Sequence, residues 1–123
     1  MTPFLLTKDI GGYNGFGLSF SDTKYSATIA QSTDTSLTIG GASPMGGMTA
    51  SSGKYIAIIN YEPGSQVWVA VNETAAVPAG ASFASTGSEM NPSARMVSAG
   101  DVVHFISPDS GGAAVSVLIY AVL

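Results

Sequence analysis

Short runs of alternating apolar and polar residues, divided by turn signals, limit the class of fold that this chain can adopt. Alternation places successive side chains on opposite faces of an extended strand, and clusters of glycine, proline and serine separate one strand from the next. No segment carries a helical period of useful length. The predicted strands are residues 25–30, 36–39, 55–61, 66–72, 81–84, 95–97, 102–106 and 115–122. About seven or eight short strands at this spacing are typical of an all-β fold, either an antiparallel β-sandwich or a jelly-roll-like barrel.

Two of the clearest strands, residues 55–61 and 66–72, are separated by a turn that contains Pro63-Gly64. A Pro-Gly pair is a strong turn signal, so these strands are predicted to form a hairpin. The second strand is apolar on both faces, which predicts that the hairpin is covered twice, by the core and by a neighbouring molecule. The side chains expected in the core or at a subunit interface are Tyr55, Tyr61, Val67, Trp68 and Val69.

The first twenty residues differ from the rest of the chain. They mix glycines with aromatic residues between Asp9 and Leu18 and show no sustained period. Glycine-rich segments lose much conformational entropy on ordering, so residues 1–20 are predicted to form a flexible arm that becomes ordered on an apolar surface. A frayed terminus is the alternative interpretation. Residues 21–123 are predicted to form a single β-domain.

Charge is sparse in this sequence. Asp, Glu, Lys and Arg make up 10% of the chain, against about 25% in ordinary soluble domains. The apolar stretches are far shorter than the roughly 18 residues that a membrane-spanning helix needs, so no membrane partner is expected. The four basic residues are scattered, whereas a nucleic-acid interface needs a clustered basic face. A surface this poor in charge predicts burial against copies of the chain or against a larger partner.

Candidate catalytic and metal-binding groups are few. The chain has no cysteine and one histidine, His104, which lies in an apolar strand without an evident partner. Residues 80–84 loosely resemble a nucleophile elbow around Ser82, but the helix that an elbow requires does not follow. The acidic residues form no calcium-loop pattern. We therefore predict no catalytic residue, no metal site and no cofactor, and a protein that is not an enzyme.

Four stretches carry a resemblance that spans about residues 20–122, namely residues 25–30, 67–72, 78–80 and 99–105. In these stretches the chain resembles the small β-rich head-decoration (cement) proteins and related virion proteins of tailed bacteriophages. Such families often form trimers on the symmetry axes of the capsid lattice and bridge adjacent capsid subunits. The resemblance is one of style and includes no motif from which site residues can be transferred.

The resemblance implies a virion structural protein that is made in the host cytoplasm and placed on the capsid surface. It would form a homotrimer, bind the major capsid protein and stabilise the head shell, which requires no catalytic group. The arm residues expected to contact the shell are Phe4, Tyr13, Phe16 and Leu18.

Two other functions stay open at the level of sequence. One is a tail- or fibre-associated β-module that binds a host glycan or receptor through Trp68 or Tyr61. The other is a small β-sandwich enzyme that uses Ser82 and His104.

Overall fold

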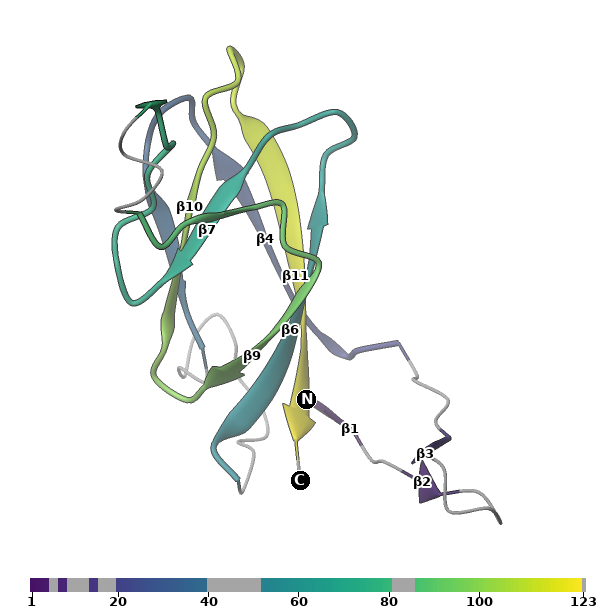
Figure 1. Ribbon diagram of the computed structural model, residues 1–123. Helices are drawn as coiled ribbons and strands as arrows, with labels where there is room; N and C mark the ends of the chain where they lie inside the picture. The colour runs from purple at the N-terminus through teal and green to yellow at the C-terminus, as the bar shows by residue number, and fades with distance from the viewer. Residues whose placement is uncertain (5–6, 9–13, 16–19, 40–51, 81–85, 123) are drawn as a thin grey trace.

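The computed structural model of the chain describes residues 1–4, 7–8, 14–15, 20–39, 52–80 and 86–122, and these parts contain strands and no α-helix. Two sheets face each other as a β-sandwich (Figure 1), which confirms the predicted all-β class. Sheet 1 consists of β1 (Thr2–Phe4), β4 (Thr23–Ile29), β6 (Lys54–Tyr61), β9 (Ala94–Ser98) and β11 (Ala113–Val122). Sheet 2 consists of β5 (Thr35–Thr38), β7 (Trp68–Val71), β8 (Glu89–Met90) and β10 (Val102–Ile106).

β11 pairs with three of the other four strands of sheet 1. Its odd-numbered residues point into the sandwich, and Val117 and Ile119 are almost completely buried. One edge of β11 pairs antiparallel with β6, and the other edge pairs first with β4 and then with β1. Sheet 1 therefore runs from β1 and β4 at one edge, through β11 and β6, to β9 at the other edge.

The core lies between the inward faces of the two sheets. Its members come from seven of the strands and from the segments next to them: Ile29, Leu37, Ile39, Tyr55, Ala57, Ile59, Val67, Val69, Val97, Val103, Phe105, Ala113, Val115, Val117, Ile119 and Ala121. Full burial of a side chain such as Phe105 stabilises the fold by about 2–3 kcal/mol. In a chain without cysteine, packing of this kind has to supply most of the stability.

The predicted hairpin between residues 55–61 and 66–72 is wrong. The turn itself forms, since the Ser65 N–H donates to the Glu62 carbonyl at 3.0 Å and Gly64 adopts a φ of 78°. The flanking strands nevertheless lie in different sheets, because β11 and β9 occupy both edges of β6. β7 pairs with β10 and β8 instead. A Pro-Gly pair predicts that the chain turns. In a β-sandwich such a turn can join strands of two different sheets as well as neighbouring strands of one sheet.

Of the predicted arm over residues 1–20, the structure describes residues 1–4, 7–8, 14–15 and 20, and the first of these belong to sheet 1. β1 pairs in parallel with the end of β11, with Phe4 opposite Val122. The N-terminal ammonium lies 3.2 Å from Asp22 Oδ1, and the Asp22 N–H donates to Thr2 Oγ1 at 2.9 Å. The chain between β1 and β4 thus leaves one edge of sheet 1 and returns to the same edge. β2 (Thr7–Lys8) and β3 (Asn14–Gly15) pair with each other within this loop, away from the sandwich (Figure 1).

Candidate functional site

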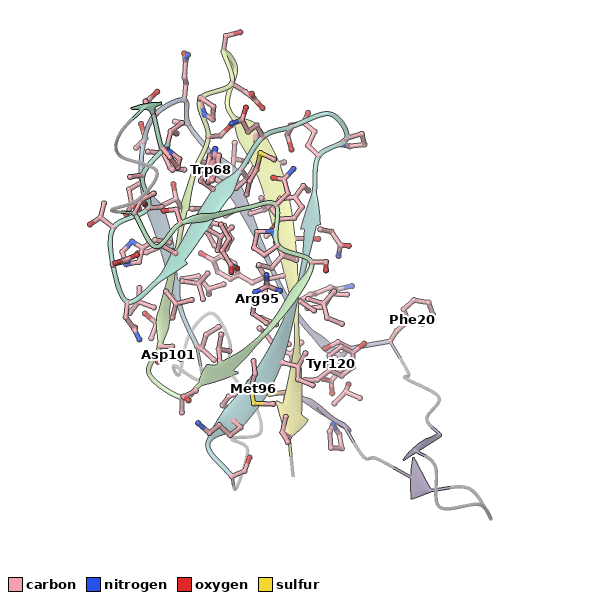
Figure 2. All side chains as sticks on the ribbon, viewed as in Figure 1. Phe20, Trp68, Arg95, Met96, Asp101 and Tyr120 are labelled. Carbon is pink, nitrogen blue, oxygen red and sulfur yellow. The ribbon has the colours of Figure 1, made fainter. Side chains whose placement is uncertain are left out.

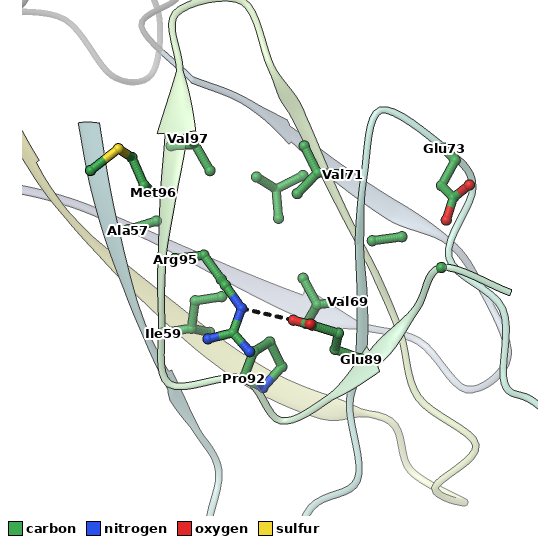
Figure 3. A pocket seen from close by; sticks show the side chains of 13 residues that line it. Ala57, Ile59, Val69, Val71, Glu73, Glu89, Pro92, Arg95, Met96 and Val97 are labelled. Carbon is green, nitrogen blue, oxygen red and sulfur yellow. Dashed lines mark hydrogen bonds and ion pairs between the residues drawn. The ribbon is translucent and has the colours of Figure 1, made fainter. Parts of the chain in front are cut away.

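A pocket opens at one edge of the sandwich, between β9 of sheet 1 and β7 and β8 of sheet 2 (Figure 3). We call it the edge pocket. Its volume is about 310 Å³, at the lower end of the range for small-ligand sites. Inward side chains of both sheets form its floor: Ala57, Ile59, Val69, Val97 and Val103. Because burying an unpaired charge is costly, this floor suits an apolar group.

Charged side chains stand at the rim of the edge pocket. Arg95 Nε lies 2.8 Å from Glu89 Oε2, and the two side chains are 50% and 54% exposed. An ion pair this exposed stabilises the fold by at most about 1 kcal/mol. Glu73 lines the same rim, where Gly87 lacks the β-carbon that would collide with the Glu73 carboxylate. Two carboxylates and one guanidinium leave the rim with a net negative charge.

The turn between β8 and β9 holds this rim in place. Asn91 adopts a φ of 45°, accepts the Val67 N–H at 2.8 Å with Oδ1, and donates from Nδ2 to the Ser65 carbonyl at 3.0 Å. The Tyr61 hydroxyl donates to the Pro92 carbonyl. Burial raises the pKa of the Tyr61 phenol, so this donor keeps its proton over the ordinary pH range. The turn is therefore bonded to β6 and to the segment that leads into β7.

The outer face of sheet 1 carries a second apolar surface. Leu118 lies opposite Ile58 across β11 and β6, and Ile56 lies opposite Met96 across β6 and β9. Met96 is 65% exposed and the other three side chains are partly exposed, whereas Tyr120 at one end of the face is buried. We call the surface made by Ile56, Ile58, Met96 and Leu118 the open face. Figure 2 shows Met96 and Tyr120 on this sheet.

Phe20 is the most exposed large apolar residue that the structure describes, at 97%. It precedes β4 and projects from the β1/β4 edge of sheet 1 (Figure 2). The chain next to it is fixed, because Ser21 Oγ donates to the Ile119 carbonyl at 2.6 Å. Desolvation opposes ionisation of Asp22, but hydrogen bonds from Thr2 and Thr23 and the N-terminal ammonium hold its pKa below the usual value.

His104 has a partner that the sequence did not reveal. Its Nδ1 lies 2.8 Å from Asp34 Oδ2, and Asp34 Oδ1 accepts the Ala75 N–H at 3.0 Å. These bonds link His104, on the outer face of sheet 2, through Asp34 to the backbone of residues 72–80, which we call the covering segment. On that face Trp68 is 8% exposed and Ala70 is buried. The His104–Asp34 pair therefore acts as a structural latch.

Among the described residues, Asp34 is the one hydrogen-bond partner of the His104 side chain. Ser82, the hypothesised nucleophile, lies outside the described residues. Within the described ranges, no group of three or more His, Asp or Glu side chains could hold a metal ion.

The residues predicted for the core or a subunit interface lie inside a single chain. Tyr55, Val67 and Val69 belong to the core, and Tyr61 packs against it while partly exposed. On the second face of the 66–72 strand, Trp68 and Ala70 are buried within the single chain, and cover by a neighbouring molecule stays a prediction. A glycan-stacking platform needs exposed rings, and the burial of Trp68 disfavours it.

Of the residues predicted to contact a shell, Tyr13, Phe16 and Leu18 lie outside the described residues. Phe4 lies in β1, where its backbone pairs with β11. Sequence reasoning missed Phe20, Met96 and the edge pocket. A bulky apolar residue directly before the polar pair Ser21-Asp22 was a usable signal for Phe20, whereas a pocket between two sheets leaves no local signal.

No protein-family model, curated protein or solved structure matches the chain. Across the described residues, no helix is long and apolar enough to cross a membrane.

Proposed function

We propose that the chain is a non-enzymatic structural protein of a virion: a decoration (cement) protein that oligomerises and stabilises the head shell of a tailed bacteriophage. The observation that carries this proposal is the open face. Ile56, Ile58, Leu118 and Met96 form an apolar surface on the central and edge strands of sheet 1, where Met96 is largely exposed and the other three side chains are partly exposed. Contiguous exposed apolar surfaces of this kind mark sites of protein association.

The low charge of the chain supports the same function. With 10% charged residues, the chain has few groups to keep its surface dispersed in water. Burial of apolar area stabilises an association by about 25 cal/mol per Å² before the entropy of binding is subtracted. A protein that binds only the assembled shell stabilises that shell by mass action, and an oligomer gains avidity from several contacts.

The chain between β1 and β4, which joins sheet 1 at both of its ends, is a second part of the molecule that we propose to contact the shell. In it lie the residues expected to contact the major capsid protein, Tyr13, Phe16 and Leu18, with Phe4 at its base. A loop tied at both ends loses less entropy on docking than a free arm of the same length. Removal of residues 1–20 would delete β1 and is therefore expected to destabilise the sheet edge as well as weaken shell binding.

The test is sedimentation of the purified chain with undecorated heads of the virus that encodes it. A double variant, Ile58→Thr with Leu118→Thr, replaces one cross-strand apolar pair of the open face. We expect its affinity for heads to fall on the order of tenfold per contact, and further for a multivalent oligomer. Met90→Ala, on the sheet 2 side, is the matched control and should bind as the natural chain does. Equal binding by the double variant, or no binding by the natural chain, would refute the proposal.

A further inference from the structure

We propose that the Phe20 ring of one copy fills the edge pocket of the next copy, so that identical chains join head to tail into a closed ring. The inference rests on the proposed function, because it names the contact that builds the oligomer. It follows from four observations: the exposure of Phe20, the shape of the edge pocket, their places in the fold, and the charges around each.

Phe20 is displayed on a rigid base. The ring is 97% exposed, although a phenylalanine of a single stable chain is normally buried. Behind it, Ser21 Oγ bonds to the Ile119 carbonyl and the Asp22 N–H bonds to Thr2 Oγ1. The chain thus presents a large apolar group at a defined place, as central anchor residues of interfaces require.

The edge pocket has the size and chemistry to receive such a ring. Its 310 Å³ exceeds one phenyl group and leaves room for the neighbouring backbone. The floor is apolar, and the ion pair between Arg95 and Glu89 lies at the rim. A guanidinium at the rim can also lie against the face or edge of an aromatic ring.

Phe20 and the edge pocket lie at opposite edges of sheet 1. Phe20 precedes β4 at one edge, and β9 lines the pocket at the other. Three strand spacings, about 14 Å, separate β4 from β9, so Phe20 does not reach the pocket of its own chain. A contact between two different surfaces of identical subunits is heterologous and closes into a ring when the rotation fits. Two copies placed side by side fill only one of their two pockets, whereas a closed ring of three copies fills all of them.

The charges around the two sites are complementary. The rim of the edge pocket carries Glu73, Glu89 and Arg95 and is net negative. Close in sequence to Phe20 lie Asp22 and the exposed Lys24, and Lys24 is the cation available to pair with the acidic rim. Opposite potentials favour this orientation of two copies over a contact between like sites.

The first experiment measures solution mass by light scattering over a range of concentrations, without shells. We expect about three times the chain mass of 12.4 kDa for the natural chain. Phe20→Ala should weaken each contact on the order of 30-fold and give a monomer at low micromolar concentration. Met90→Ala, which removes another exposed apolar side chain (54%), should keep the ring. A monomeric or dimeric natural chain, or an unchanged mass for Phe20→Ala, would overturn the proposal.

The second experiment tests the Phe20 side and the pocket side of the contact separately. Val71 lines the edge pocket and is 39% exposed, so Val71→Trp should block the pocket and also give a monomer. An equimolar mixture of Phe20→Ala and Val71→Trp should form a heterodimer, because one intact Phe20 meets one intact pocket. A mixture that stays monomeric would contradict the head-to-tail contact.

Charge reversal tests the same contact without altering any buried residue. Lys24→Glu should weaken the ring, and adding Glu73→Lys to the same chain should restore it; failure of this rescue would contradict the orientation. These masses are measured without shells, so the ring and the binding to heads can fail independently.

Discussion

On the outer face of sheet 2, Trp68 and Ala70 are buried, whereas on the outer face of sheet 1 Ile58 and Leu118 stay partly exposed. Both faces carry apolar side chains on central strands of their sheets. On the outer face of sheet 2, Asp34 joins His104 to the backbone of the covering segment at Ala75. The proposed association through the open face depends on this difference, because contiguous exposed apolar surfaces mark sites of association.

The largest loss of unfolding free energy is expected for a substitution on the outer face of sheet 2. Trp68→Ala removes a large side chain that is 8% exposed and should lower the free energy of unfolding by about 3–5 kcal/mol. Met96→Ala on the open face should cost less than about 1 kcal/mol. Urea unfolding followed by circular dichroism measures both. Equal losses for the two variants would show that the faces do not differ.

Breaking the His104–Asp34 latch should cause the next largest loss of unfolding free energy. His104→Asn removes the bond to Asp34 and should cost about 1.5–3 kcal/mol, with faster hydrogen exchange in the covering segment. Ser36→Ala is the control, because Ser36 lies opposite His104 on β5 and is exposed. Unchanged exchange in residues 72–80 of the His104 variant would contradict the assignment of the pair as a latch.

Low pH should weaken the bond between Asp101 and Asn72, the residue at the start of the covering segment. The backbone N–H of Ser98 and the Asn72 amide hold the pKa of Asp101 below its usual value of 3.8. A depressed carboxyl pKa contributes stability that is present above about pH 4 and is lost as the pH falls through the pKa of the folded state. Asp101→Asn should reduce this loss of stability between pH 4 and pH 2. An identical acid transition in the variant would assign it to other carboxylates.

The smallest loss of unfolding free energy is expected for a substitution on the open face of the isolated chain. Ile58 and Ile59 are neighbours in β6, but Ile58 lies on the open face and Ile59 in the core. Ile58→Thr should cost less than about 1 kcal/mol, and Ile59→Thr about 2–4 kcal/mol. Similar melting temperatures for the two variants would mean that another part of the chain already covers the open face.

The sequence predicts the strands well because alternation is a local property. The predicted strand 115–122 lies within β11, and 102–106 coincides with β10. The pairing of strands is not local. Residues 55–61 and 66–72 were expected to pair, but the partners of β6 come from more than thirty residues away along the chain.

The candidate surfaces were harder to predict than the strands. The low charge of the chain predicts a buried outer surface, but it does not say which face is involved. Trp68 was a reasonable candidate for an interface because its strand is apolar on both sides. Its burial within the single chain depends on packing between segments that are distant in sequence, which no local pattern reveals; the bond between Ala75 and Asp34, for example, joins residues 41 positions apart.

Oxidation of two methionines tests the central claim most directly. Met96 on the open face and Met90 on β8 of sheet 2 are 65% and 54% exposed in the chain alone, so hydrogen peroxide should oxidise them at similar rates. After the protein binds undecorated heads, mass spectrometry should show strong protection of Met96 and little change at Met90. Oxidation of Met96 at its original rate in the bound protein would contradict the account.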